Sequence, residues 1–285
     1  PADIAVVTQW ARLEGFAPGT GDVDIYRHTD RQGLWVGWLR DRPIGCIAGV
    51  KYNPAYGFIG MFLVIPEERG RGYGVQLWQK ALNHLADVPC IGLEAAPDRI
   101  DDYSKWNFSV SSPTTRWQWI GHESVPSDFL TDQKEYNGLK LFEGRHIPSS
   151  SVQAYDALRE PSPRPHFIAD WLRHSDGTVM ALIDGKGLCH GFGRIRPCLL
   201  KEGHGWRIGP LLADDTFLAE LLITRLLTHH PGVVLLDAPG RNPLAKELFE
   251  KLGFLKLSTT YRMYRGEQPP ISMHDVFGLA CLELG

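Results

Sequence analysis

This chain contains an internal duplication, which limits it to folds that can occur twice along one polypeptide. The segments starting Gly33-Leu-Trp-Val-Gly and Gly177-Thr-Val-Met-Ala each hold two apolar, β-prone runs joined by a short turn, so each predicts a hairpin. Leu93-Glu-Ala-Ala-Pro97 resembles Leu236-Asp-Ala-Pro239, in the same order and at the same offset of about 144 residues. We therefore expect two copies of one domain, joined near residues 127–137.

Each copy shows the same pattern of helices and strands. Each copy is expected to begin with a helical region (3–14 in the first copy, 149–174 in the second), which the hairpin follows. A third strand (58–65; 206–212) then leads into an amphipathic helix (75–85; 217–228). A buried strand (91–95; 233–237), a second helix (101–106; 243–252) and a last strand complete the copy. Strands that alternate with helices predict an α/β (α+β) fold, with a mixed, mostly antiparallel sheet flanked by helices in each copy. The expected domains are 1–130 and 139–285.

Composition and charge exclude several classes of protein. Of the 285 residues, 43% are hydrophobic and 22% are charged, which is ordinary for a globular protein. The formal net charge of −3 provides no basic field for nucleic acid, so we expect no such partner. No apolar run approaches the ~18–20 residues that a membrane-spanning helix needs, and no secretion signal is visible at the N-terminus. We expect a cytoplasmic protein without membrane contact.

The cysteines and histidines indicate no metal site. The five cysteines are odd in number and form no CxxC pair, which favours reduced, buried thiols over disulfides or zinc ligands. No HExxH motif is present among the 11 histidines. The adjacent pair His229-His230 lies at an expected helix end, where the helix dipole favours cations. We expect no metal.

A glycine-rich loop, Arg69-Gly-Arg-Gly-Tyr-Gly74, lies between an expected strand and an expected helix. Gly70, Gly72 and Gly74 allow unusual backbone angles and close approach of a ligand. The amides of this loop would converge at the positive end of the helix dipole, where phosphate binds, and Arg69 and Arg71 can add charge-assisted bonds. The loop lacks the Gly-Lys-Ser/Thr of a Walker A motif, and it reads GxGxG where a dinucleotide fingerprint needs GxGxxG. The alternative is a plain glycine-rich turn.

The stretch from Val64 to Gly74 resembles the signature loop of the GNAT superfamily of N-acetyltransferases. Its core, Arg/Gln-x-x-Gly-x-Gly/Ala, is met by Arg69, Gly72 and Gly74. Tyr103-Ser-Lys-Trp-Asn-Phe108 is similar to the family's Tyr-x-x-x-Gly-Phe, with asparagine in place of glycine. The resemblance spans nearly the whole chain and is to tandem GNAT proteins that have an active first copy and a diverged second copy.

The resemblance implies that acetyl-CoA is the co-substrate and lies in a V-shaped gap between the fourth and fifth strands of the first copy. Main-chain groups of Leu63 and Val64 would bond the pantetheine arm and the acetyl oxygen. Amides of the loop would hold the pyrophosphate. The implied cofactor-binding residues are Leu63, Val64, Arg69, Gly70, Arg71, Gly72, Tyr73 and Gly74.

In this family the acceptor amine attacks the thioester directly, without an acyl-enzyme. The resemblance makes Tyr103 the general acid for the leaving thiolate, although a plain aromatic at the core edge is the alternative. The base stays open. The candidates are Glu94 on the fifth strand, Asp22 or Asp24 in the acceptor-side loop, and the Gly285 carboxylate, because a C-terminal carboxylate reaches the active site in the similar enhanced-intracellular-survival acetyltransferases. A solvated or structural role is the alternative for each side-chain carboxylate.

The second copy lacks the features that would bind acetyl-CoA. Its strand runs almost directly into its helix, and Asp214 and Asp215 stand where pyrophosphate would lie. Acidic residues at a helix start stabilise the helix but repel phosphate. Phe249 occupies the tyrosine position and cannot donate a proton. We expect this copy to shape the acceptor pocket, to mediate a homodimer or to stabilise the first copy.

These features predict an N-acetyltransferase that moves an acetyl group from acetyl-CoA to a primary amine. A small-molecule amine is favoured, because the second copy and the N-terminal loop would crowd an extended peptide. Two alternatives remain, a non-catalytic acyl-CoA-binding regulator and an ATP-binding module. Aromatic residues border the acceptor cleft in relatives and can hold an ammonium group, although core packing explains most of them. These are Trp10, Phe16, Tyr26, Trp35, Tyr56 and Phe58.

Overall fold

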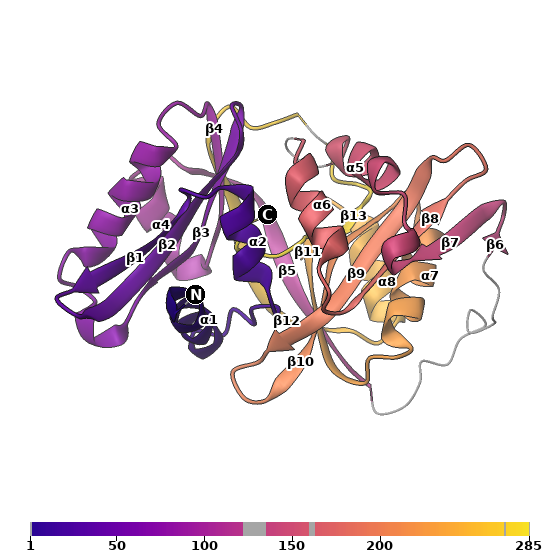
Figure 1. Ribbon diagram of the computed structural model, residues 1–285, viewed down its shortest axis with the longest axis horizontal. Coiled ribbons are helices and arrows are strands. Elements are labelled where there is room, and N and C mark those ends of the chain that lie inside the picture. The colour runs from indigo at the N-terminus through magenta and orange to yellow at the C-terminus, as the bar shows by residue number, and fades with distance from the viewer. Residues whose placement is uncertain (1, 122–134, 160–162, 271, 285) are drawn as a thin grey trace.

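A computed structural model describes residues 2–121, 135–159, 163–270 and 272–284 (Figure 1). The first half contains α1 (Ala2–Leu13), α2 (Asp22–Thr29), β1 (Leu34–Leu39), β2 (Arg42–Asn53), β3 (Tyr56–Val64), η1 (Pro66–Glu68), α3 (Tyr73–His84), β4 (Cys90–Ala95), η2 (Pro97–Arg99), α4 (Ile100–Ser104) and β5 (Ser109–Gly121). The second half contains β6 (Glu135–Tyr136), β7 (Leu139–Glu143), η3 (Gly144–His146), α5 (Ser149–Ala157), α6 (Pro165–Arg173), β8 (Thr178–Ile183), β9 (Cys189–Leu199), β10 (His204–Ala213), α7 (Thr216–Leu227), β11 (Gly232–Pro239), α8 (Pro243–Lys251), β12 (Leu255–Gly266) and β13 (Val276–Gly278).

The duplication predicted from the sequence is confirmed element by element. The hairpin β1–β2 corresponds to β8–β9, and the run β3–α3–β4–α4–β5 corresponds to β10–α7–β11–α8–β12. The expected helical region 149–174 is confirmed and consists of two helices, α5 and α6. The assignment of Asp22 and Asp24 to an acceptor-side loop was wrong, because both residues lie on helix α2. Gly21, in the left-handed region at φ 80°, starts α2, which buries Val23, Ile25 and Tyr26.

All the named strands belong to one sheet of mixed, mostly antiparallel character, in the order β1-β2-β3-β4-β12-β5-β11-β10-β9-β8-β7-β6, with β13 beside β10. The two copies exchange their last strands. Strand β12 of the second copy pairs with β4, and β5 of the first copy pairs with β11 (Figure 1). The sheet of each copy is therefore completed by the other copy. The domain limits at 130 and 139 stay a prediction, and residues 122–134 lie outside the described residues.

The hydrophobic cores follow the strand exchange. Met263 of β12 is fully buried in the core beneath α3, with Leu77 and Leu93 of the first copy. Trp117 of β5 packs against Phe249 of α8, with 5.7 Å between ring centroids. A third core joins α1 and α2 to α5, α6 and the tail 276–284. Neither copy buries its apolar side chains alone, so we infer that the two copies fold as one unit.

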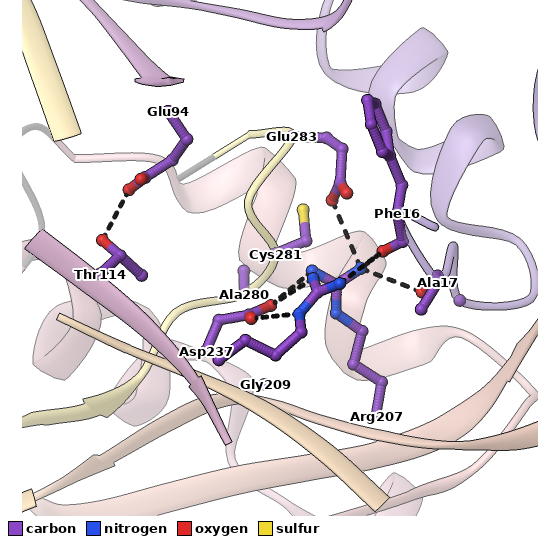
Figure 2. A network of polar contacts seen from close by, with 12 residues as sticks. Phe16, Ala17, Glu94, Thr114, Arg207, Gly209, Asp237, Ala280, Cys281 and Glu283 are labelled. Carbon is purple, nitrogen blue, oxygen red and sulfur yellow. Dashed lines mark hydrogen bonds and ion pairs between the residues drawn. The ribbon is translucent and has the colours of Figure 1, made fainter. Parts of the chain in front are cut away.

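A buried network of charges holds the exchanged strands and the tail together (Figure 2). Arg116 of β5 and Arg207 of β10 donate to opposite oxygens of Asp237, each at 2.7 Å. Arg207 also donates to the carbonyl oxygen of Ala17 at 3.1 Å and faces Glu283 of the tail at 3.4 Å. These side chains are at most 7% exposed. Buried charges of this kind are tolerated only when they are paired and hydrogen-bonded.

Replacing Asp237 by asparagine should lower the free energy of unfolding by about 3–5 kcal/mol, because two buried guanidinium groups would lose a shared carboxylate. Burial alone would raise the pKa of Asp237, but Arg116 and Arg207 lower it to about 2. Because this folded pKa is below the unfolded value, the stabilisation is present above about pH 4 and is lost as the pH falls toward 2. Urea unfolding between pH 2.5 and pH 7 measures both effects.

The matched control for this prediction is Glu250→Gln. Glu250 lies 3.9 Å from Lys246 in an exposed pair on α8. Its removal should change the free energy of unfolding by no more than about 0.5 kcal/mol. Equal destabilisation by both variants would contradict a structural role for the buried network.

Candidate functional site

The strands β3 and β4 separate part-way along their length. They pair in parallel from Tyr56 with Cys90 to Ile59 with Leu93, and no later pair occurs between them in the described chain. Beyond this point β4 pairs only with β12, and β3 continues to Val64. The register between β2 and β3 shifts at the same place, where Met61 has φ 48°. The result is a V-shaped gap, into which the unpaired edge of β3 presents main-chain donors and acceptors.

The loop 65–72 connects β3 to α3. Gly70 and Gly72 have φ 74° and 84°, which only glycine adopts readily. A Cβ atom at either position would meet nothing within 4 Å, so the backbone angles, and not crowding, require glycine. No side chain caps α3, whose N-cap is Gly72. The first-turn amides of α3 are therefore open to an anion, as the sequence predicted.

The two arginines of the loop have different surroundings. Arg69 donates through Nε to the carbonyl oxygen of Val64 at 2.8 Å and forms an ion pair with Glu14 of α1. Arg71 is 60% exposed and contacts Glu68 at 3.0 Å. Arg69 thus ties the loop to β3 and α1, whereas Arg71 can still turn toward a bound phosphate. The carbonyl of Val64, assigned to the pantetheine arm, already accepts a bond from Arg69.

A cavity of about 90 Å³ lies at the end of β3, beside the C-terminal end of α1. Its walls include Leu63 and Val64, which the sequence assigned to the cofactor. The full lining is Trp10, Leu13, Glu14, Leu63, Val64, Ile65 and Pro66. The structure therefore brings the predicted main-chain segment, the loop and α1 to one place.

Tyr103, the predicted general acid, lies on α4 and packs against Trp78 of α3, with 5.1 Å between ring centroids. Burial raises the pKa of Tyr103 to about 12, and Arg99 opposes this shift. The hydroxyl therefore keeps its proton at neutral pH. Asn107, which replaces the family's glycine, has φ 66°, and Gly253 stands at φ 81° in the second copy. Asparagine tolerates this left-handed region, so the helix end is the same in both copies.

The side chain of Glu94, a candidate base, is 3% exposed and accepts three hydrogen bonds from the exchanged strands. Thr114 of β5 and Thr260 of β12 donate at 2.9 Å each, and Arg262 of β12 donates through Nε at 2.7 Å. Figure 2 shows Glu94 turned toward Thr114. Oε1 of Glu94 accepts two of these bonds and Oε2 accepts one, so Oε2 keeps one acceptor position that could take a proton from an amine. Sequence reasoning missed Arg262, because nothing local in β12 indicates its partner.

The other candidate bases have different surroundings. Asp22 is buried and bonds Arg196 at 2.7 and 2.8 Å. Burial opposes the ionised form, yet the charge of Arg196 leaves the pKa of Asp22 below its ordinary value. Asp24 is exposed on α2. Gly285 lies outside the described residues, but the main chain of Glu283, shortly before it, lies against Gly60 of β3. Tyr52 donates to the carbonyl oxygen of Leu284 at 2.9 Å.

The second copy fills its own helix start with side chains. Only two residues, 214–215, separate β10 from α7. Asp215 caps α7 by accepting from the amide of Leu218 at 2.8 Å. Asp214 accepts from the Tyr155 hydroxyl at 2.7 Å and bonds His190 at 2.8 Å. A side chain thus caps α7, whereas no side chain caps its counterpart α3. That the second copy does not bind acetyl-CoA stays a prediction.

Comparisons with known proteins bear on the same two regions. Residues 5–105 match the sequence profile of the Acetyltransferase (GNAT) family, and residues 152–278 match that of an Acetyltransferase (GNAT) domain. The chain belongs to the GNAT superfamily of acyltransferases. Its two GNAT domains are in tandem, which confirms the resemblance and the fold class predicted from the sequence.

Several proteins resemble this tandem GNAT chain over nearly its full length. Holothin acyltransferase of Pseudoalteromonas sp. (strain SANK 73390) is 27% identical over 282 residues, which covers 98% of this chain and 90% of that protein. A Pyrococcus horikoshii protein classed among the acetyltransferases has a TM-score of 0.79 at 21% identity, covering 100% and 93% of the two chains. A tandem GNAT protein from the clavulanic acid biosynthesis pathway has a TM-score of 0.60 at 15% identity, covering 92% and 95%. At 21% and 15% identity, these two solved structures support the fold of this chain and nothing about its activity.

Two further observations concern the described residues only. No group of three or more histidine, cysteine, aspartate or glutamate side chains is placed there to hold a metal ion. None of the helices in this part of the chain is long and apolar enough to cross a membrane.

Proposed function

We propose that the first copy transfers an acetyl group from acetyl-CoA to the primary amine of a small molecule, in a ternary complex. The observation that carries the proposal is the gap between β3 and β4, which lies next to a helix start that no side chain caps. The second copy has no counterpart of this loop. The similarity to holothin acyltransferase supports acyl transfer.

The residues of the first copy match the demands of this reaction. The amine nitrogen forms the new bond to the acyl carbon, and the carbon–sulfur bond breaks. A main-chain amide on the unpaired edge of β3 would stabilise the oxyanion, and Tyr103 would give its proton to the leaving thiolate. The base for the amine proton stays a prediction, with Glu94, Asp24 and the Gly285 carboxylate as candidates.

The acceptor side of the gap is enclosed by the second copy, which favours a small acceptor. Gly60 of β3 lies directly against the main chain of Glu283. Tyr52 of β2 meets Phe167 of α6 edge to face, with 5.7 Å between centroids. An extended peptide would have to displace the tail and α6. A homodimer and a cytoplasmic location also stay predictions.

Calorimetric titration with acetyl-CoA tests the proposal. We expect one molecule bound per chain, because α7, the counterpart of α3 in the second copy, is capped by Asp215, whereas no side chain caps α3. Replacing both Asp214 and Asp215 by asparagine should leave this ratio unchanged, because the shortened loop of the second copy would still lack a phosphate site. Two molecules per chain would contradict the argument for a silent second copy.

A screen of primary amines with thiol detection then separates catalysis from binding. Thiol release that depends on the amine supports the enzyme. Binding of acetyl-CoA without release by any amine would favour the alternative, a non-catalytic acyl-CoA-binding regulator. Binding of ATP but not of CoA would revive a nucleotide-binding module.

A further inference from the structure

Arg262 is a buried arginine whose two terminal nitrogens have no hydrogen-bond partner among the described residues. It lies on β12, opposite Glu94 of β4, and the residue is 3% exposed. Its Nε donates to Glu94 at 2.7 Å, and its guanidinium lies 5.0 Å from the centre of the Phe58 ring. Nη1 and Nη2 have no hydrogen-bond partner in the part of the chain that the structure describes. Four N–H groups of a buried cation are therefore unsatisfied.

The hydroxyl of Tyr56 is a second buried donor without a partner among these residues. Tyr56 begins β3, and its hydroxyl lies over Gly92 of β4. A Cβ atom on Gly92 would be 2.6 Å from this oxygen and 2.9 Å from the Phe58 ring. The glycine at position 92 thus makes room for the two aromatic side chains. Buried polar groups in native proteins are seldom left unbonded.

Both donors lie on the acceptor side of the gap. Ile59, Leu93 and Met263 point into the core beneath α3. Side chains alternate along a strand, so Phe58, Gly92 and Arg262 point to the opposite face. This is the face that the tail and α6 enclose. The last pair of β3 and β4 joins Ile59 to Leu93, so Arg262 and Glu94 lie at the apex of the gap.

The charges indicate which ligand suits this place. Glu94 already neutralises Arg262, and the remaining N–H groups need oxygen acceptors, which a planar guanidinium fork binds in pairs. The attacking amine must be neutral, so a second carboxylate would leave a net negative charge in a buried site that already holds the Arg262–Glu94 pair. An uncharged carbonyl oxygen supplies the acceptor without that charge.

We propose that Arg262, assisted by Tyr56, binds a carbonyl oxygen of the amine acceptor, and that the acceptor is an amine with a neighbouring uncharged, amide-type carbonyl. The proposal rests on the acyl transfer proposed above, since it places the acceptor beside the gap. Arg262 is then a specificity residue that the second copy supplies to the first copy through the exchanged strand. This explains how a copy without its own phosphate loop contributes to the site.

The test compares three amines that differ in the carbonyl group, namely phenylalaninamide, phenylalanine and phenethylamine. An aromatic series suits a site bordered by Tyr56, Phe58 and Tyr264. Each amine is titrated by calorimetry into the 285-residue chain saturated with CoA, so binding is measured without turnover. We expect phenylalaninamide to bind about 10- to 100-fold more tightly than phenethylamine, and phenylalanine to bind less tightly than the amide.

Three variants show whether Arg262 is responsible. The double variant Glu94→Gln/Arg262→Gln removes both charges together and should bring the ratio of the amide and phenethylamine affinities close to 1. Arg262→Lys keeps the charge opposite Glu94 but loses the planar fork, so it should also lower the ratio if the double variant fails to fold. Arg265→Gln changes a partly exposed arginine on the same strand and should leave the ratio unaltered.

Several results would overturn the inference. The first is an unchanged ratio of phenylalaninamide to phenethylamine affinity in both Arg262 variants. The second is equal binding of the three amines to the wild-type chain, and the third is no binding of any of them. If phenylalanine binds most tightly of the three amines, Arg262 binds a carboxylate and not an uncharged carbonyl, and the proposal is wrong. If phenylalaninamide binds more tightly than phenethylamine as expected, but no amine releases thiol from acetyl-CoA, the proposed acetyl transfer is wrong. The binding site at Arg262 would still be supported.

Discussion

Replacing Gly72 by aspartate should weaken CoA binding by about 100-fold, the largest effect on affinity that we expect from a single change. The carboxylate would stand beside the first-turn amides of α3, which no side chain caps. It would repel the pyrophosphate and compete for the same donors. The second copy shows the arrangement naturally, because Asp215 accepts from the amide of Leu218 at the start of α7. Isothermal titration with CoA measures the loss.

The control is Gly72→Asn, which has the same shape without the charge. Asparagine and aspartate both tolerate the φ of 84° at this position better than other residues with a side chain. The neutral variant should weaken binding by no more than about tenfold. The difference between the two variants should shrink in high salt, because screening reduces the repulsion. Equal affinities for both variants at low salt would mean that the loop does not hold phosphate.

Replacing Tyr103 by phenylalanine should lower kcat by about 10²–10⁴-fold while CoA affinity stays within a factor of about three. The variant removes the proton for the leaving thiolate and keeps the ring that packs against Trp78. Because burial raises the pKa of Tyr103 to about 12, the wild-type hydroxyl keeps its proton up to about pH 10. Titration of Tyr103 should therefore not reduce the wild-type rate between pH 8 and pH 10. Steady-state kinetics with any amine found in the screen provide the measurement.

The control for this prediction is Tyr136→Phe. Tyr136 lies on β6 of the second copy and bonds Arg225, away from the gap between β3 and β4. Its removal should leave kcat unchanged. If Tyr103→Phe also keeps the wild-type kcat, Tyr103 is a packing residue at the edge of the core, and another group or water protonates the thiolate.

The strand exchange changes how the role of the second copy is understood. The sequence offered three roles for it, namely to shape the acceptor pocket, to mediate a dimer or to stabilise the first copy. The structure shows that it completes the first copy's sheet with β12, and that α6 and the tail pack against the face of this sheet opposite α3. The capped helix start of the second copy is therefore compatible with retention of its fold. Its strand and tail supply contacts that the first copy lacks.

Features that depend on neighbours in sequence could be predicted without coordinates. Apolar spacing placed α3 and α7 within about two residues, because helix periodicity is local. The open loop at Gly72 and the blocked one at Asp215 could be distinguished from residue types alone, since glycine conformations and caps act within one turn. The missed helix α2 is short and mostly polar, and its burial depends on α6 and the tail.

The sequence by itself determined the duplication, the fold class, the glycine loop and the absence of that loop from the second copy. Only the tertiary structure decided which strands are exchanged and which charges meet. Arg262 and Glu94 are 168 residues apart, and Arg196 and Asp22 are 174 apart. The physical reason is that such pairs form only where strand register and burial bring them together, and a buried charge is stable only beside its partner. The candidate acceptor site belongs to this second class, because each copy supplies part of it.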